Sequence, residues 1–371
     1  MPEAIGWLAP PWAQQGGAAL GLLPLALLVA LAADRLWGEP PLRWHPVVWM
    51  GRALEAIGQR MAPTAPTGRD IRSFCLAALA WSSLAAMVLV VAALLQALLL
   101  WTVAPGPRLV GGAVPVLPGS TEVHAMAVLY AAARWLLAAL LLGLLLKPLL
   151  ALALLQSEVR AVEAALAESL DAGRARLAWL VSRDVAQLTA DEVRQSAIES
   201  LAENLNDSVV APLLWFALLG LPGAALYRFA NTADAMWGYP GLRGQGDQQR
   251  YWQWAGKWAA RADDVLSWLP ARLTALLLAL AAGGVPLRVL AHEARKTPSP
   301  NSGWPMAAMA LALGVRLSKP GAYCLHPQGR APTAQDAQQA QHLVSKVALA
   351  LVLLALAALI LIVGERLRHG P

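Results

Sequence analysis

Six long apolar runs limit what this chain can fold into. A helix must carry about 17 to 25 mostly apolar residues to cross the hydrocarbon core of a bilayer. Charged residues make up only 14% of the chain, compared with about 25% in a soluble domain. We therefore expect an integral membrane protein that crosses at the second, third and last runs, with a first run of marginal length. The runs lie near residues 16–33, 76–103, 126–155, 209–226, 273–285 and 347–363.

The basic residues indicate which side of the membrane each connecting segment occupies. Arginines recur between the first two runs, whereas Arg108 is the only basic residue between 103 and 126. Cytoplasmic loops carry the excess of Lys and Arg, so the first loop is predicted to be cytoplasmic and the second external. The net charge of +6 follows this topology, and no nucleic-acid partner is expected. The segments predicted on the cytoplasmic face are 34–75, 156–208, 227–272 and 288–346.

Two of the apolar runs are expected to enter the membrane without crossing it. The fourth run contains Pro212 and Pro222, and the fifth is flanked by Pro270 and Pro286. A full crossing by either run would leave a basic segment on the external side. The predicted fold class is an all-α, polytopic integral membrane protein, a single domain over 1–371. It has about four to five transmembrane helices, re-entrant or interfacial helices and cytoplasmic helical loops.

Charged residues near the first, third and last runs add to the predicted topology. The first 17 residues contain no Lys or Arg, so a signal peptide's basic region is missing and the first helix is expected to stay uncleaved. Arg366 and Arg368 resist export, which leaves the side of the C-terminus open. Arg134 is expected at the interface, because Trp135–Leu155 alone is long enough to span. The expected location is the bacterial inner membrane, with the active face cytoplasmic.

The clearest functional signal is a predicted helix with one acidic face. Thr189 and Glu192 fit a capping box at its start. Glu199, Glu203 and Asp207 follow at i, i+4 and i+8, where each like-charged pair costs about 0.2 to 0.5 kcal/mol. A solvated helix face explains this pattern as well as a binding site does. The functional alternative is a Mg²⁺ site, because Mg²⁺ binds through one or two carboxylates together with substrate phosphates.

Four further segments are rich in polar residues, Gly and Pro. In residues 33–52, His45 has no partner at metal-ligand spacing, so a capping or packing role is expected. In residues 297–310, Asn301, Ser302 and nearby backbone amides could receive an anion at a helix N-terminus. No Walker A, GxGxxG, HExxH or GxSxG motif occurs in the sequence. The other two segments, 229–239 and 258–274, carry Asn231, Asp234, Arg261, Asp263, Asp264 and Arg272.

In this order, these segments resemble the adenosylcobinamide-phosphate synthase family, membrane proteins of cobalamin biosynthesis. The shared motifs run from GEP at residue 38 through HPVVWMGR, SRDVAQL, ESLAENLND, NTADAMWGY, ADDVLSWLPARLT and SPNSGWPMAAMA. The resemblance implies an ATP-dependent amide ligase that joins an aminopropanol, or its O-phosphate, to the free carboxylate of adenosylcobyric acid. The chain departs from the family pattern at Glu39, Leu205, Ser208, Ser267 and Leu311.

The implied cofactors are ATP and Mg²⁺. A carboxylate becomes a good acyl donor once it is phosphorylated, and phosphoryl transfer depends on positioning and charge neutralisation. Glu199, Glu203 and Asp207 are the predicted Mg²⁺ ligands. No residue is singled out as the base that takes the amine proton. Arg261 and Arg272 are predicted to contact phosphate oxygens, with Asn301 and Ser302 also assigned to the nucleotide, and Asn231, Asp234, Asp263, Asp264 and Asn301 to the amine or a second metal.

The expected partners are the corrinoid substrate adenosylcobyric acid, aminopropanol phosphate and membrane lipid. Other enzymes of the cobalamin pathway and a second copy of the chain stay open as partners. Two other functions also stay open. A non-catalytic membrane sensor or regulator of the same superfamily should have lost the acidic motif, and a transporter should place its ionisable residues within its spans.

Overall fold

The computed structural model describes residues 21–103, 121–181, 184–244 and 246–369. Its described strands form two short antiparallel pairs, β1 (Leu242–Arg243) with β2 (Arg250–Tyr251) and β3 (Leu317–Lys319) with β4 (Tyr323–Leu325). All its other regular structure is helical, so the predicted all-α class is confirmed. The helices are α2 (Leu22–Trp37), α3 (Pro46–Met61), α4 (Ile71–Val103), α5 (Thr121–Leu146), α6 (Leu152–Glu168), α7 (Leu170–Leu177), α8 (Ala190–Leu205), α9 (Ala211–Leu219), α10 (Leu221–Ala233), α11 (Lys257–Ala281), α12 (Leu287–Ala294), α13 (Gly303–Leu313) and α14 (Ala334–His369).

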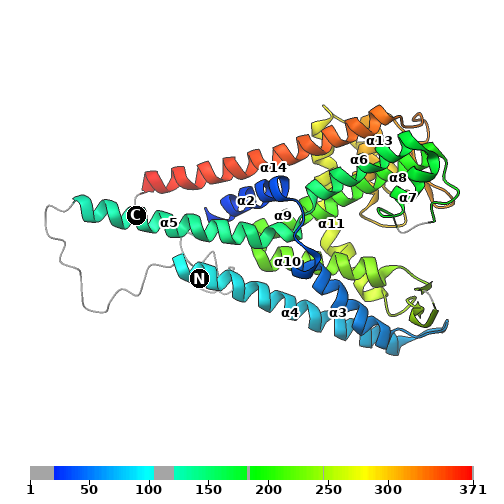
Figure 1. Cartoon of the computed structure of the whole chain (residues 1–371), viewed down its shortest axis with the longest axis horizontal. Coiled ribbons are helices and arrows are strands. Elements are labelled where there is room, and N and C mark those ends of the chain that lie inside the picture. The colour runs from blue at the N-terminus through cyan, green and yellow to red at the C-terminus, as the bar shows by residue number, and fades with distance from the viewer. Residues whose placement is uncertain (1–20, 104–120, 182–183, 245, 370–371) are drawn as a thin grey trace.

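Long apolar helices make this a polytopic membrane protein. Figure 1 shows α4, α5 and α14 running along the long axis of the molecule. Their outer faces are apolar, with Leu79 and Leu98 exposed on α4 and Leu353 and Ile360 exposed on α14. Apolar surface of this extent indicates contact with lipid. In the described part of the chain, four stretches are long and apolar enough to span: Ile71–Trp101, Ala132–Glu168, Lys257–Ala281 and Ala334–Glu365.

Helix α2, from the first apolar run, packs against α5 and α14. Its Ala26 and Ala30 are completely buried. Gly143 on α5 permits the close approach, because a Cβ at that position would lie 2.6 Å from the carbonyl oxygen of Ala26. The part of the predicted first run before residue 21 lies outside the described residues.

The fourth apolar run folds as a helical hairpin. Helix α9 has nine residues and continues directly from the helical turn Asn206–Val210 that follows α8. Gly220, with φ +71°, turns the chain directly into α10. Gln96 on α4 accepts a hydrogen bond from the Leu221 N–H at 2.7 Å, which satisfies a donor at the start of α10. The predicted re-entrant segment would need its backbone satisfied by protein groups in this way.

In the fifth apolar run, Pro270 was expected to interrupt the helix, but it lies inside a helix. Helix α11 continues through it without interruption. Proline leaves unsatisfied the carbonyl four residues earlier, which here belongs to Leu266. The indole N–H of Trp215 donates to that carbonyl at 3.0 Å. The run is therefore the second half of a helix whose first half carries Asp263 and Asp264.

The third apolar run is also not a single helix. Helix α5 ends at Leu146, and a short 3-10 turn, Lys147–Leu149, with Pro148 at its second position, separates it from α6. The predicted span Trp135–Leu155 lies within Ala132–Glu168, which is long and apolar enough to cross the membrane although this turn interrupts it. Arg134 lies near the start of that stretch, with its guanidinium 5.5 Å from the centre of the Tyr130 ring.

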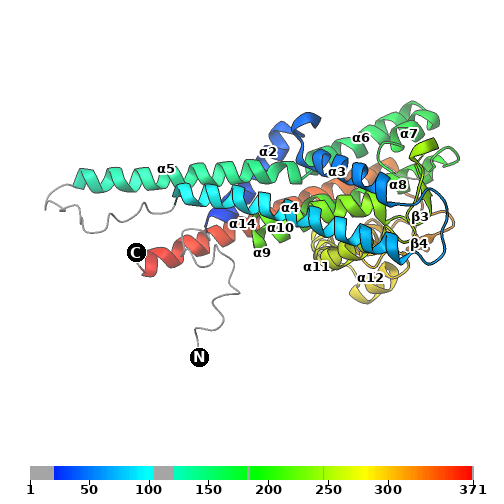
Figure 2. The ribbon, with the colours of Figure 1, turned by 90° about the horizontal axis from the view of Figure 1, so that it is seen from below.

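The polar segments gather at one end of the molecule. Figures 1 and 2 show α6, α7, α8 and the β3–β4 hairpin at the end opposite to the last turns of α4 and the first turns of α5. The C-terminal end of α14 lies on the same side as those turns. The structure thus places the end of α14, left open by the charge pattern, far from the polar segments.

Candidate functional site

A cavity of about 730 Å³ lies among these polar segments. Its walls come from α8, the end of α10, the first half of α11, the loop before α13 and the β3–β4 hairpin. Most residues that the sequence singled out line it, although they come from separate parts of the chain. They are Glu199, Glu203, Asp207, Asn231, Asp234, Asp263, Asp264, Asn301 and Ser302.

Helix α8 starts and points as its sequence predicts. The capping box is present, since the Thr189 hydroxyl accepts from the Glu192 N–H and the Glu192 carboxylate accepts from the Thr189 N–H at 2.8 Å. Glu199 is only 2% exposed and lines the cavity with Glu203. The alternative of a solvated helix face is therefore wrong for Glu199.

Two π-helical turns carry the central motifs of the site. One, Asn206–Val210, follows α8 and contains Asp207; the other, Asp234–Gly238, follows α10 and contains Asp234. The wider turn changes the direction of the side chains that follow, and such turns are frequent at functional sites. The second turn is anchored by Trp237, which is buried and stacks on Trp252 with ring centres 5.7 Å apart.

Asp207 is held by protein groups on several sides. Its Oδ1 accepts hydrogen bonds from Asn206 Nδ2 at 2.8 Å and from the Tyr227 hydroxyl at 3.3 Å. Asn206 is itself fixed, because its Oδ1 accepts from Thr274 at 3.0 Å. Burial raises the pKa of the Asp207 carboxyl, although these bonds and the charge of Arg228 act in the opposite direction.

Arg228 joins α10 to the π-helical turn after α8. Its Nη1 donates to the carbonyl oxygen of Asp207 at 2.9 Å, to Ser208 Oγ at 3.2 Å and to Asn231 Oδ1 at 3.2 Å. The departure from the family pattern at Ser208 therefore supplies an acceptor for this arginine. The sequence analysis missed Arg228 and Tyr227. A charged residue close to an apolar run was the available signal.

Asp263 lies at the inner end of a second polar chain. Its Oδ2 accepts from Ser267 at 3.3 Å, and the Ser267 hydroxyl lies 3.1 Å from that of Tyr227. Its Oδ1 is buried and has no hydrogen-bond partner among the described residues. An orphaned buried carboxylate oxygen is costly unless a ligand or cation meets it. The Ser267 departure thus keeps a bridging hydroxyl at this position.

Asp234 lies among the other acidic groups of the cavity. Burial, together with the nearby charges of Asp264 and Asp207, raises its pKa to about 6. Gly238 allows the close packing, because a Cβ there would collide with Asp234 Oδ1. An acidic group with a pKa in this range can exchange a proton near neutral pH.

Arg272 positions a loop rather than facing the cavity. Its guanidinium donates to Asn301 Oδ1 at 2.8 Å and to the Pro300 carbonyl at 3.2 Å. It also lies between the rings of Trp268 and Trp304, with centres 4.6 and 4.9 Å away. Asn301 in turn donates to the Asp264 carbonyl at 2.8 Å. The predicted contact of Arg272 with phosphate is therefore replaced by a role in holding Asn301 against α11.

Two other predicted anion contacts also differ in the structure. Arg261 is exposed and does not line the cavity. The backbone N–H groups of Asn301 and Ser302 both donate to Ser299 Oγ at 3.2 Å, so this start of α13 does not present them to an anion. The side chains of Asn301 and Ser302 remain on the cavity wall.

The three predicted metal ligands do not form a ready-made site. Within the described ranges, no group of three His, Cys, Asp or Glu side chains could hold a metal ion. Asp207 instead accepts hydrogen bonds from Asn206 and Tyr227. Mg²⁺ needs only one or two carboxylates when phosphates supply further oxygens, and the oxygen-rich wall fits that form of binding.

The sequence analysis also missed the β3–β4 hairpin, which brings Lys319 and Tyr323 to the cavity. The hairpin packs on α8, where Ser318 donates to Gln195 at 2.7 Å. Gly321, with φ +72°, makes its turn. Lys319 is the only Lys or Arg among the described lining residues. The Pro-Gly pair after Lys319 was the available sequence signal for this turn.

His45 takes part in a charge cluster outside the cavity. It lies 3.1 Å from Glu39, and Lys147 lies 3.1 Å from the same carboxylate and 3.6 Å from Asp34. Asp34 accepts from the Ala153 N–H at 2.8 Å, at the start of α6. Burial alone would raise the pKa of Glu39, but its bonds to His45 and Lys147 outweigh burial and lower it. His45 therefore contacts Glu39, and its side chain does not cap α3.

The sequence of the chain is similar to those of known proteins. The CobD/Cbib protein family matches residues 27–354. A probable cobalamin biosynthesis protein CobD of Methanothermobacter thermautotrophicus is 35% identical over 338 residues, covering 90% of this chain and 95% of the relative. The cobalamin biosynthesis protein CobD of Chromobacterium violaceum is 37% identical over 357 residues, covering 91% and 97%. No solved structure matches the chain. The chain belongs to the CobD/Cbib protein family.

Proposed function

We propose that this protein acts in cobalamin biosynthesis as an ATP-dependent amide ligase, an adenosylcobinamide-phosphate synthase of the bacterial inner membrane. The names of its relatives support the pathway. The observation that carries the reaction class is the cavity, in which six carboxylates face one described lysine. Such a wall favours a cationic amine and metal-bound phosphates, and both belong to this reaction.

The substrate carboxylate would take the γ-phosphoryl group of ATP, releasing ADP. The amine of aminopropanol phosphate would then attack the acyl phosphate and release inorganic phosphate as the amide forms. Glu199 and Glu203 would hold Mg²⁺ together with phosphate oxygens, and the ion would supply neutralisation of the charge on the transferred phosphoryl group. Lys319 lies on the opposite hairpin and would bind a substrate phosphate. In this proposal Lys319 takes the phosphate-binding role that the sequence predicted for Arg261 and Arg272.

The amine must arrive as a cation and lose a proton before it attacks. Asp263 and Asp264 lie together on α11 and would bind the ammonium group, with Asn301 fixing the backbone next to them. The pKa of Asp234, about 6, suits proton acceptance near neutral pH. We therefore assign the proton transfer to Asp234.

One reaction tests this function directly. Purified protein in lipid nanodiscs is incubated with adenosylcobyric acid, ATP, Mg²⁺ and either aminopropanol or its phosphate, and the corrinoid is analysed by mass spectrometry. A corrinoid with the mass of the amide product, formed only when ATP is present, is expected. Unchanged corrinoid with both amines, from protein that is folded by its melting curve, would overturn the proposal.

A further inference from the structure

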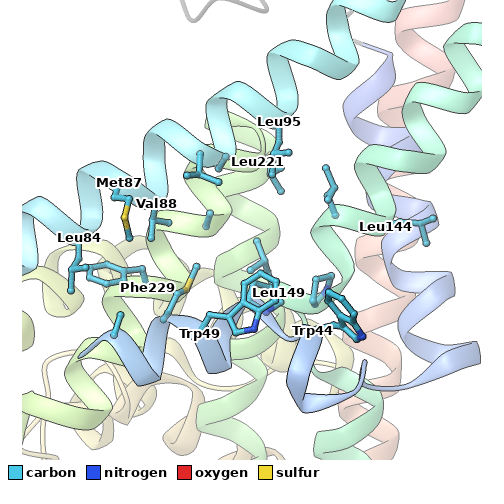
Figure 3. A pocket seen from close by; sticks show the side chains of 18 residues that line it. Trp44, Trp49, Leu84, Met87, Val88, Leu95, Leu144, Leu149, Leu221 and Phe229 are labelled. Carbon is cyan, nitrogen blue, oxygen red and sulfur yellow. The ribbon is translucent and has the colours of Figure 1, made fainter. Parts of the chain in front are cut away.

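A second pocket, on the membrane side of the molecule, has no part in the proposed reaction. It has a volume of about 390 Å³, which is within the usual range of ligand pockets, about 300 to 1,000 Å³. Figure 3 shows it between α4, α10, the end of α5, the start of α3 and the segment before α3. All of its lining residues are apolar or tryptophan. Water would find almost no hydrogen-bond partners in such a space.

The pocket opens onto the surface that faces lipid. Its inner wall is buried, with Phe229, Leu221 and Leu149 each no more than 3% exposed. On its outer side lie Met87 and Leu95 of α4, which are 54% and 40% exposed. Helix α4 is long and apolar enough to span the membrane, so the hydrocarbon chains around it are the apolar molecules that can enter.

The mouth of the pocket carries groups suited to a lipid headgroup. Trp44 and Trp49 line it and are 64% and 49% exposed, and tryptophan is the side chain typical of the membrane interface. The Arg43 guanidinium lies 5.9 Å from the centre of the Trp44 ring. Trp49 Nε1 donates to the Arg43 carbonyl at 2.9 Å. Arg43 is exposed and has no ion pair with another described residue.

We propose that this pocket binds one acyl chain of an anionic phospholipid, whose headgroup phosphate lies at Arg43. An exposed arginine beside the surface attracts anionic lipid, and the chain gains free energy from each methylene that it buries. The occupied pocket would also support α10. Leu221, Ala225 and Phe229 of that helix line the pocket, while its Arg228 holds the turn that contains Asp207.

The experiment uses the full chain in nanodiscs with a photoactivatable group on the acyl chain of the lipid. Phosphatidylglycerol and phosphatidylcholine are compared, and crosslinked residues are mapped by mass spectrometry. We expect crosslinks to the buried inner wall, at Phe229 or Leu221, several-fold more abundant with phosphatidylglycerol. Crosslinks confined to the outer face of α4, or crosslinks to a second copy of the chain at this pocket, would overturn the proposal.

Matched variants separate the pocket from the general lipid surface. Met87→Trp should fill the outer side of the pocket and reduce inner-wall crosslinking several-fold, whereas Val90→Trp, on the same helix and 57% exposed outside the pocket, should not. Arg43→Gln should abolish the preference for phosphatidylglycerol, whereas Arg52→Gln, exposed on α3, should keep it. Equal crosslinking in both tryptophan variants, or an unchanged preference in Arg43→Gln, would contradict the assignment. These readouts do not depend on catalytic activity.

Discussion

Glu203 is the carboxylate whose replacement best tests the proposed metal site. It lines the cavity one helical turn after Glu199, and Glu203→Gln keeps its shape while removing its charge. Loss of a metal ligand should raise the Mg²⁺ concentration needed for ligation at least about tenfold. A Mg²⁺ titration of product formation measures this. The control is Asp191→Asn, which removes an exposed charge from the same helix. A near wild-type rate for Glu203→Gln across the titration would refute its assignment as a ligand.

Lys319 supplies a second test, aimed at phosphate recognition. A charge-assisted hydrogen bond contributes about 1.5 to 3 kcal/mol, so Lys319→Gln should raise KM for the phosphate-bearing substrate that it contacts by about tenfold or more. Separate titrations of ATP and aminopropanol phosphate identify which substrate that is. Lys257→Gln is the control, because Lys257 lies over the ring of Trp254, outside the cavity. Unchanged KM values for both substrates would remove Lys319 from the site.

Sequence predicted individual site residues well where the pattern itself carried the chemistry. The spacing of Glu199 and Glu203 already placed both on one face of a helix. The contacts of Arg272 were not predicted, because a free arginine and one held between two tryptophans look alike in a sequence. Its partner Asn301 lies 29 positions away, and no local pattern reports a contact over that separation. The same limit hid the bond between Tyr227 and Asp207.

At the scale of helices, the indole of Trp215 replaces the backbone donor that Pro270 removes from α11. Trp215→Phe should leave the Leu266 carbonyl without a donor and destabilise the protein by about 1 kcal/mol or more. Pro270→Ala restores the backbone N–H that would bond to this carbonyl within the helix. Trp215→Phe should therefore cost little in the Pro270→Ala background. Melting temperatures of the two single variants and the double variant measure this coupling, and purely additive effects would contradict it.

Helix α12 and the β3–β4 hairpin are joined by Glu293. It accepts hydrogen bonds from Lys296 Nζ and from the His326 N–H, both at 2.6 Å. Burial would raise its pKa, but these bonds and the charge of Lys296 outweigh burial and lower it below 4.5. Its contribution to stability is therefore present above pH 4.5 and lost as the pH falls below that value.

Replacing this carboxylate should reduce the dependence of stability on acid. Glu293→Gln should lower the melting temperature at neutral pH and lose less stability than the wild type as the pH falls. Glu55→Gln, an exposed change on α3, should behave like the wild type. Parallel melting curves for Glu293→Gln and the wild type at every pH would show that the carboxylate has no such linkage.

Helix boundaries were predicted where local chemistry determines them and were missed where a distant side chain does. The capping box fixed the start of α8, because all of its donors and acceptors lie within four residues. Pro270 suggested a break, since a sequence does not show that Trp215 can satisfy the carbonyl it frees. The fourth run was predicted to return without crossing, but its turn at Gly220 and the bond from Leu221 to Gln96 could be known only from the structure.

At the scale of the whole molecule, the charges at the end of α14 and the position of that end indicate opposite sides of the membrane. Arg366 and Arg368 favour the cytoplasm, whereas Figure 1 places the end of α14 away from the cavity. The helix has 36 residues and is about 54 Å long, well beyond the roughly 30 Å of hydrocarbon. Its last turns therefore extend past the bilayer, where basic residues are solvated. We therefore expect α14 to cross the membrane, so that its end is external and the cavity is cytoplasmic.

Single-cysteine labelling tests this topology in a chain from which Cys75 and Cys324 have been removed. Glu365→Cys, exposed near the end of α14, should react with a membrane-impermeant thiol reagent in cells whose outer membrane alone is permeable. Gln249→Cys and Glu168→Cys, exposed at the cavity end, should react only after the inner membrane is opened. The positive-inside rule predicts that the cavity end is protected in intact inner membranes, and the length of α14 predicts that its own end is accessible from outside. Labelling of Gln249→Cys from outside would place the segment after α10 across the membrane and contradict the re-entrant hairpin, whereas protection of Glu365→Cys would show that α14 does not cross.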